Sequence, residues 1–491
     1  MKISILCILT TMIALGSNRA TAKQEIQEPR INVLLITLDD MGYQSLGITG
    51  CKIPDITPHI DRLASEGIIF QHGHVVTTIC SPSRSVMLSG RYPHNNGIMG
   101  HVMGQGGRQP FADWEPPDII TPPLPEYLSQ HGYLTGAILK VAGLEPITFH
   151  TLYNDHPFGV GFHDRNPQSF YNRTKAFLDE SKSAGKPFFL YANPIDPHRP
   201  WPDTDQEQQK LATFNPDKPY PSPEQKYAPE RIDVPDFLPD LPKVREALVP
   251  YYESVHRGDA CVGAILKAVD DSRLRENTVV IFLSDHGMAF AGAKFSLYHA
   301  STRTPIVVRW PKVVKAGQID TTHVVSSVDL MPTIVEAVGL PPIQGMDGIS
   351  FLPLAKGQPS SLQRQRAYSA HNYGLSFEPR SFYPMRTVTD TDYLYIWNGY
   401  TERESTNKPF NRYYHKVLAP YTNDEYPKVK QRVDLLVNKP AEEFYDLSDD
   451  PGCWNNLADN SEYRKKLSAY RNFLREEMKR NSDPELKYFR P

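Results

Sequence analysis

The 491-residue sequence has few cysteines, little net charge and, beyond its first residues, no apolar run long enough to span a membrane. Five cysteines are too few for a disulfide framework, so stability has to come from a buried core. A net charge of −3 excludes a global positive field that would attract nucleic acid or an anionic membrane. We therefore expect no nucleic-acid partner and no membrane span, and a polyanionic substrate would need a local basic site.

The chain is instead rich in apolar residues and in proline. Hydrophobic residues make up 40% of the sequence, which is enough for a large core at this length. Many of the 44 prolines lie in residues 194–202 and 216–242. We expect these stretches to be long loops, which often carry binding function when a rigid scaffold positions them.

The first 22 residues have the pattern of a secretory signal. Lys2 supplies a positive charge, residues 3–15 are mostly apolar, and Ala20-Thr21-Ala22 resembles a cleavage site. The apolar run is too short to span a membrane comfortably. We therefore expect residues 1–22, with Cys7, to be removed. The mature protein would be exported to the periplasm or the medium, or to the lysosome in a eukaryote.

Strands and helices alternate along most of the chain. Apolar runs predict buried strands, and helical spacing of apolar residues predicts helices between them. This order indicates an α/β fold with a large, mostly parallel sheet flanked by helices. After about residue 360 the amino-acid composition becomes more polar and aromatic, which predicts a smaller α+β domain. We expect a large domain at 23–360 and a small one at 361–491. The expected strands are 31–38, 187–192, 278–283, 305–310 and 393–397, and the expected helices are 58–67, 124–131, 244–269 and 461–480.

Polar clusters follow three of the buried strands. Asp39 and Asp40 come directly after residues 31–38, and Ser284, Asp285 and His286 come after residues 278–283. Asn193 and residues 196–199 (DPHR) come after residues 187–192. Ligands of open α/β sheets bind at the carboxyl ends of strands, so these clusters should meet at one edge. Carboxylate oxygens favour hard cations such as calcium or magnesium. A pair of adjacent aspartates is more often a solvated turn, but two pairs after buried strands favour a metal site.

The most informative stretch is residues 80–90, CSPSRSVMLSG. A lone cysteine is by default a small buried hydrophobe. With Pro82 and Arg84 in place, however, the stretch resembles the signature of the formylglycine-dependent (type I) sulfatases. In that family a maturation enzyme reads C-x-P-x-R and oxidises the cysteine to Cα-formylglycine. The resemblance implies the sulfatase fold, which is like that of alkaline phosphatase, with an antiparallel sheet in the small domain. From about Ser83 we expect a helix whose N-terminus would face an anion.

Other residues match the same family in order and rough spacing. By this resemblance Arg84 stabilises the hydrated aldehyde, Lys140 and Lys294 bind sulfate, and His198 acts near the scissile bond. Arg303 is taken as structural. The implied catalytic residues are Cys80, Arg84, Lys140, His198 and Lys294; the implied calcium ligands are Asp39, Asp40, Cys80, Asp285 and His286.

One departure from the family lies just after Lys140. The family usually has G-K-x-H here, whereas this chain has Leu139 before the lysine and Ala142 in place of the histidine. The loss leaves open which base completes turnover, and His101, His150 and His299 are candidates to replace it. Within the family, residues 81–100, 188–199 and 383–386 (YPMR) resemble the heparan N-sulfatase (sulfamidase) branch. The YPMR stretch either lines the substrate pocket or packs a sheet edge.

These observations favour an exported sulfatase that hydrolyses sulfate esters or sulfamates on oligo- or polysaccharides. A nucleophile at residue 80 would split the displacement into two steps. Two alternatives stay open at the level of sequence: a phosphatase or phosphonate hydrolase of the same superfamily, and a non-catalytic protein that binds sulfated glycans.

Overall fold

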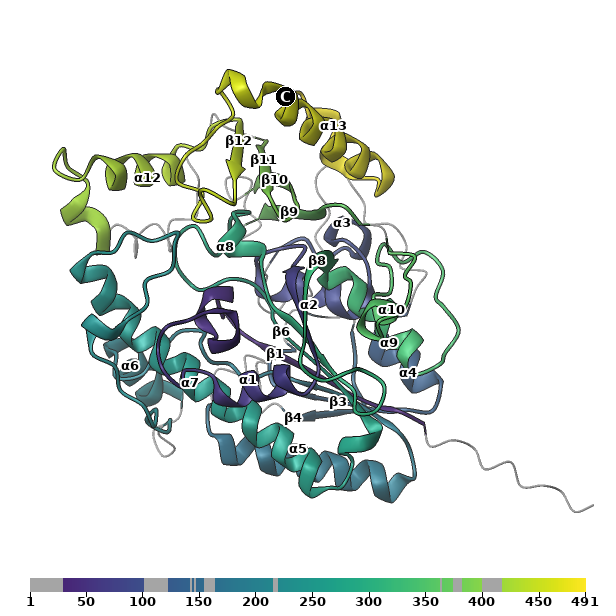
Figure 1. Cartoon of the computed structure of the whole chain (residues 1–491). Coiled ribbons are helices and arrows are strands. Elements are labelled where there is room, and N and C mark those ends of the chain that lie inside the picture. The colour runs from purple at the N-terminus through teal and green to yellow at the C-terminus, as the bar shows by residue number, and fades with distance from the viewer. Residues whose placement is uncertain are drawn as a thin grey trace, which may run out of the picture.

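The computed structural model describes residues 30–100, 122–141, 144, 147–153, 164–214, 220–362, 364–373, 382–399 and 417–491. The expected secretory signal, Ala142 and His101 lie outside these residues. Two sheets form the framework, a large mixed one and a small antiparallel one (Figure 1). The strands of the large sheet are β1 Asn32–Leu38, β2 Ile68–His74, β3 Leu134–Ile138, β4 Thr151–Tyr153, β5 Phe188–Ala192, β6 Thr278–Ser284, β7 Ile306–Arg309 and β8 Gln318–Ser326.

The large sheet has the order β4-β3-β5-β1-β6-β7-β2-β8. All pairs from β4 to β6 are parallel, β7 is antiparallel to both of its neighbours, and β2 pairs parallel with β8. The predicted mostly parallel sheet with flanking helices is therefore confirmed. Strands β1 and β6 lie at its centre, side by side.

Helices cover both faces of this sheet, which explains why its central strands are continuous apolar runs. Along β1, Val33 and Leu35 pack into one core, and Leu34 and Ile36 into the other, because successive side chains of a strand point to opposite faces. The helices are α1 Pro58–Ser65, α2 Cys80–Ser89, α3 Pro93–Asn96, α4 Leu124–Gln130, α5 Pro167–Ala184, α6 Asp205–Phe214, α7 Pro242–Asp271, α8 His299–Thr302, α9 Leu330–Ala337 and α10 Leu352–Ala355. None of the described helices is both long and apolar enough to cross a bilayer.

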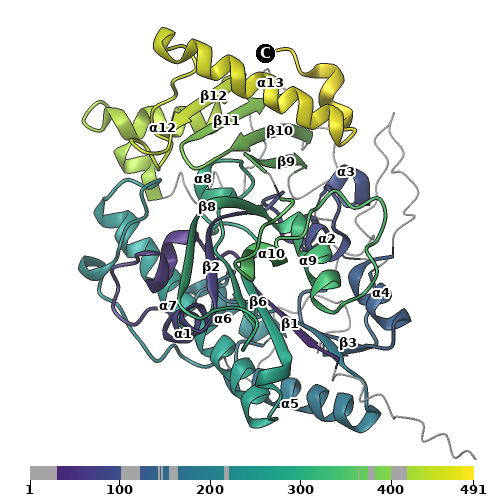
Figure 2. The same ribbon diagram turned by 45° about the vertical axis from the view of Figure 1, so that its right-hand side comes forward.

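The small sheet has the order β12-β11-β10-β9 and is antiparallel throughout. Helix α13 lies across it, as Figure 2 shows. The sheet joins the large unit through a backbone hydrogen bond from Ala370 N to Val76 O, 2.7 Å long. The elements are β9 Ala367–Tyr373, β10 Phe382–Thr389, β11 Tyr393–Asn398, β12 Glu442–Asp446, α12 Pro427–Val437 and α13 Arg464–Arg480.

The described cysteines are few, as the sequence indicated, and none is paired. Cys51, Cys80, Cys261 and Cys453 are free thiols, and all except Cys51 are buried. The stability of the described chain therefore comes from packing and polar contacts.

Candidate active site

The two acidic clusters meet at the carboxyl ends of β1 and β6. Leu38 and Ser284 are partners in the register of these strands, so the residues that follow them leave the sheet together. Asp285 N donates to Leu38 O at 3.1 Å, and Asp40 N donates to the Asp285 carboxylate at 3.2 Å. Asp39, Asp40, Asp285 and His286 are all essentially inaccessible to solvent. The sequence prediction that strand ends would bring them together is correct.

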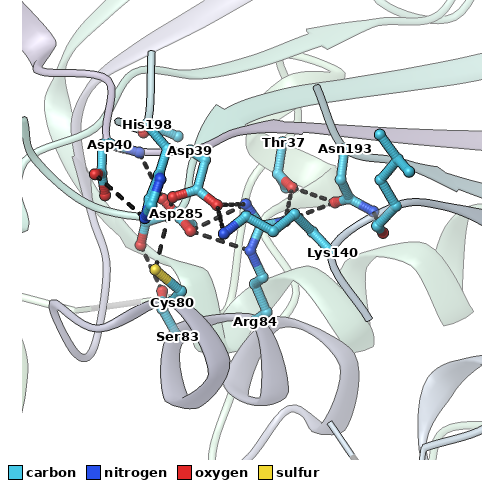
Figure 3. Close-up of polar contacts among 12 residues, drawn as sticks. Thr37, Asp39, Asp40, Cys80, Ser83, Arg84, Lys140, Asn193, His198 and Asp285 are labelled. Carbon is cyan, nitrogen blue, oxygen red and sulfur yellow. Dashed lines mark hydrogen bonds and ion pairs between the residues drawn. The ribbon is translucent and has the colours of Figure 1, made fainter. Parts of the chain in front are cut away.

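Helix α2 brings Cys80 to the same point. The helix begins at Cys80, three residues earlier than the sequence suggested, and Ser83 Oγ ties its first turn to β6 by donating to Asp285 O at 2.6 Å. The Cys80 sulfur lies 3.6 Å from Asp39 Oδ1 and 3.5 Å from His286 Nε2 (Figure 3). Burial raises the pKa of this thiol to about 12, so the unmodified side chain is a protonated thiol.

Arg84 lies one turn after Cys80 and is completely buried. Its Nε donates to Asp285 Oδ2 at 3.0 Å, and its Nη2 lies 3.3 Å from Asp39 Oδ2. The guanidinium therefore bridges the two acidic clusters and partly neutralises them. Its remaining nitrogen, Nη1, donates to three uncharged groups, which are Thr37 Oγ1 at 2.6 Å, Asn193 Oδ1 at 2.7 Å and Tyr191 OH at 3.1 Å.

Each aspartate of the first pair has its own lysine. Lys140 Nζ lies 2.6 Å from Asp39 Oδ2, and Lys294 Nζ pairs with Asp40 Oδ1 and lies 3.6 Å from the Cys80 sulfur. Burial favours a protonated Asp39, but Lys140 and the other nearby cations hold the pKa of this carboxyl well below its usual range. Burial opposes a charged Lys294 as well, yet Asp40 raises the pKa of this lysine. Both lysines therefore bring positive charge to the thiol.

Two histidines face the cluster through the same ring nitrogen. His286 Nδ1 lies 3.0 Å from Gly287 O, and His198 Nδ1 lies 2.6 Å from Arg199 O, so the proton of each neutral ring sits on Nδ1. The Nε2 of His286 is then 3.5 Å from Asp40 Oδ1, and that of His198 is 3.9 Å from Asp40 Oδ2. Burial, assisted by Lys140, lowers the pKa of His198 well below its usual range.

The donor set fits a divalent cation. One atom from each of four residues lies within 4.8 Å of the other three; the residues are Asp39, Asp40, Cys80 and His286. A carbonyl that fixes Nδ1 and leaves Nε2 for the metal is the usual support of a histidine ligand. Carboxylates suit calcium or magnesium, whereas the imidazole also suits transition metals. Asp285 lies beside this group, but Arg84 binds its Oδ2 and the Asp40 amide its Oδ1.

Two other sequence hypotheses concern residues away from this cluster. Arg386 of the YPMR stretch is completely buried and paired with Asp483, so this arginine packs the small sheet. His150 and His299 make no hydrogen bond or ion pair with Cys80 or the acidic clusters within the described chain. The backbone N of His150 donates to Thr135 Oγ1 at 3.2 Å, and the His299 ring stacks on His74.

Around Arg84 the structure adds Thr37 and Tyr191, which the sequence did not single out, and it gives a partner to Asn193, which the sequence placed in a polar cluster without a role. Thr37 and Tyr191 lie inside apolar strand sequences, and Asn193 follows β5 directly. A polar residue inside or next to a buried strand requires a partner. That requirement was the signal available in the sequence, although it does not identify the partner.

Comparisons with known proteins give two family-model matches and several relatives that cover most of the chain. The sulfatase family model matches residues 31–340, and a model described as the C-terminal part of N-sulphoglucosamine sulphohydrolase matches residues 288–407. An ulvan-active sulfatase of Formosa agariphila is 26% identical over 479 residues, which cover 93% of this chain and 84% of the relative. Human N-sulphoglucosamine sulphohydrolase is 29% identical over 482 residues, with coverage of 92% and 91%.

Solved structures share the fold at lower identity. A protein in complex with its substrate D-glucosamine-2-N,6-O-disulfate has a TM-score of 0.65 at 20% identity, covering 93% of this chain and 99% of that one. The phosphonate monoester hydrolase of Agrobacterium radiobacter has a TM-score of 0.61 at 16% identity, with coverage of 92% and 96%. At these identities the likeness concerns the fold alone.

Proposed function

The chain belongs to the sulfatase family and is a sulfuric ester hydrolase, and from this we propose that it is an exported enzyme that releases sulfate from sulfated saccharides. We take N-sulfoglucosamine as the first substrate to test. The match of residues 288–407 and the likeness to human N-sulphoglucosamine sulphohydrolase support this choice. The ulvan-active relatives support O-sulfate esters of another polysaccharide as the alternative within the same class.

One observation carries the proposal. The Cys80 sulfur, at the first residue of a buried helix, lies within 3.6 Å of a carboxylate, an imidazole nitrogen and an ammonium group. A structural cysteine would pack among apolar side chains. Here the thiol faces the donor set of a divalent cation, with Arg84 one turn away. This is the arrangement expected of a nucleophile that attacks an anionic group.

The groups around residue 80 divide the chemistry between them. A formylglycine formed from Cys80 would supply a hydrated aldehyde, one hydroxyl of which attacks sulfur. A divalent cation, with calcium as our proposal, would be held by Asp39, Asp40 and His286 beside Asp285 and would polarise the sulfuryl oxygens.

The remaining residues handle charge and protons. Lys140, Lys294 and Arg84 supply positive charge to the oxygens of the sulfuryl group as negative charge develops on them. Arg84 and Lys294 are buried and the Lys140 side chain is 11% exposed, so these charges act at a dielectric below that of water. His198 Nε2 is the atom that would hand a proton to the departing oxygen or nitrogen, because its Nδ1 is fixed on Arg199 O. The neutral ring has no proton on Nε2, so this nitrogen must first take one up, which the negative charge of a bound sulfuryl group favours.

The test is a panel of defined sulfated saccharides assayed for released sulfate, with protein produced in a host that converts C-x-P-x-R cysteines. N-sulfoglucosamine, O-sulfated glucosamines and ulvan oligosaccharides form the panel, and Cys80→Ala is the matched inactive control. We expect wild type to release sulfate from at least one saccharide and Cys80→Ala to release none. Sulfate release by neither protein on any of them would contradict the proposal.

A phosphonate or phosphate ester hydrolase is the second candidate, because a phosphonate monoester hydrolase shares the fold. Aryl sulfate and aryl phosphate, compared on the same enzyme, separate the two. A strong preference for phosphate would replace the first proposal.

Mass spectrometry of the Cys80 peptide decides whether the protein is a non-catalytic glycan binder. Full retention of the thiol from a converting host would favour that alternative.

The division into domains at residues 23–360 and 361–491 stays a proposal, which limited proteolysis would test.

A further inference from the structure

We propose that Asn193 is a positioning residue that holds Arg84 and Lys140 at a fixed separation for one sulfuryl group. The inference rests on the proposed function, and it concerns a residue outside the set implied by the family resemblance. Asn193 is completely buried and directly follows β5, between β1 and β3 in the sheet. Its amide faces both of the elements that carry the two cations.

The oxygen of the amide serves Arg84. Asn193 Oδ1 accepts from Arg84 Nη1 at 2.7 Å and from Thr37 Oγ1 at 2.5 Å. These contacts fix the end of the guanidinium that does not touch the carboxylates of Asp39 and Asp285. Because an amide is neutral, it orients the arginine without removing positive charge from the site. A carboxylate at this place would compete with the substrate for that charge.

The nitrogen of the same amide serves the turn that carries Lys140. Asn193 Nδ2 donates to Leu139 O at 3.1 Å and to Ile138 O at 3.2 Å. Leu139 and Lys140 both have left-handed backbone conformations, with φ of 58° and 52°. Two consecutive residues with side chains are unfavourable in this region and persist only where their surroundings hold them. The Asn193 side chain helps to hold this backbone conformation through its hydrogen bond to the carbonyl of Leu139, the residue before Lys140.

One side chain therefore links cations that come from different parts of the fold. Arg84 comes from α2 and Lys140 follows the end of β3, and Asp39 contacts both directly. Asp39 is also a candidate metal ligand, so its carboxylate has several positive partners. The neutral Asn193 contacts Arg84 directly and Lys140 through the backbone carbonyl of Leu139. A displacement of about 1 Å in a positioned group can reduce the rate about a hundredfold. Loss of the Asn193 contacts should therefore reduce kcat.

The experiment compares Asn193→Ala and Asn193→Asp with Asn32→Ala on the substrate found for the wild type, with inorganic sulfate as a competitive inhibitor. Asn32 is a matched control, because it is a buried asparagine at the opposite end of β1, where its Oδ1 accepts from Phe188 N at 3.1 Å. We expect Asn193→Ala to reduce kcat by about tenfold to a hundredfold and to weaken inhibition by sulfate. We expect Asn32→Ala to change stability only.

Asn193→Asp removes the donor to Leu139 O while keeping an oxygen for Arg84. Part of its effect should therefore pass through Lys140, and the rest through the added negative charge beside Arg84. In a Lys140→Ala background, the part that passes through Lys140 is absent, so both substitutions at position 193 should cost less than in the wild type. If Asn193→Ala fails to fold, the comparison of Asn193→Asp in the two backgrounds gives the answer by itself.

Two results would overturn the inference while leaving the proposed function intact. One is an Asn193→Ala enzyme with kcat and sulfate inhibition within about twofold of wild type, and the other is full multiplicativity of the effects at positions 193 and 140. A wild-type enzyme that neither releases sulfate nor is inhibited by it would overturn the proposed function, and this inference with it.

Discussion

Asp483→Asn should destabilise the small sheet strongly without affecting substrate binding. Arg386 on β10 and Asp483, just after α13, form an ion pair in which both side chains are completely buried. Arg386 Nη2 donates to Asp483 Oδ1 at 2.8 Å, its Nε donates to Oδ2, and Tyr368 OH donates to the same oxygen. The substitution leaves the guanidinium charged and buried and removes the carboxylate that is paired with it.

The magnitude follows from those contacts. Two hydrogen bonds between charged groups contribute about 1.5–3 kcal/mol each. Loss of one partner of a buried ion pair costs about 3–5 kcal/mol, because the other charge remains in a medium of low dielectric. We therefore expect the free energy of unfolding to fall by about 3–5 kcal/mol.

The dependence on pH gives a second check. Burial favours a protonated Asp483, but Arg386 holds the pKa of this carboxyl well below its usual range. The stabilisation is then fully present above the pKa of an unfolded aspartate, about 3.9, and is lost as pH falls through the lower pKa of the folded state. The neighbouring His94 also has a lowered pKa, chiefly because it is buried. The difference between wild type and variant should therefore be the same at pH 6 and pH 8.

Urea unfolding followed by tryptophan fluorescence measures this difference, since Trp397 pairs with Arg386 across β10 and β11. Asp424→Asn is the control, because the Asp424 side chain is 97% exposed and the urea midpoint should not move. KM should be unchanged for the folded fraction, since a buried Arg386 does not reach a saccharide. An unchanged urea midpoint for Asp483→Asn, or a large rise in KM with normal stability, would refute the structural role of the pair.

Three further predictions concern the active site. His286→Ala should lower the content of bound divalent metal, measured by elemental analysis, and calcium should restore activity to chelator-treated wild type; equal metal content in both proteins would remove His286 from the ligand set. His198→Ala should slow saccharide substrates far more than nitrophenyl sulfate, because a poor leaving group needs a proton and nitrophenolate does not; equal losses on both would end its assignment as the acid. Ala142→His should speed the release of sulfate in single-turnover experiments, whereas an unchanged or lower rate would show that another residue already serves as the base or that the pocket excludes an imidazole.

The two central strands could be predicted from the sequence, because burial on both faces leaves a continuous apolar pattern within each segment. The strands that became β1 and β6 are buried on both faces, so they appear as continuous apolar runs, and the aspartates after them mark the carboxyl ends. What the sequence did not contain is the order of the strands. The antiparallel direction of β7 depends on pairing between distant segments and leaves little local trace.

The residues of the candidate site also divide into those that the sequence predicts and those that it does not. Residues that carry charge or a distinctive motif, such as Cys80 and Lys294, were found from the sequence. Thr37 and Tyr191 were not found, and Asn193 was placed at the sheet edge without a role. The reason is that all three contact Arg84, which comes from a helix far away in the sequence. Arg386 shows the converse. Its stretch resembles a branch of the family, but only the contact with Asp483 shows which role the side chain has.

The position of Cys80 in α2 bears on when the proposed oxidation could take place. Every residue of the first turn of this helix is buried, so the stretch that a maturation enzyme would have to bind is inaccessible once the chain has folded. The proposed oxidation of the thiol would then have to precede packing of the helix against the sheet. Native protein that escaped this step would stay inert when mixed with the maturation enzyme, and only unfolding would make it competent again.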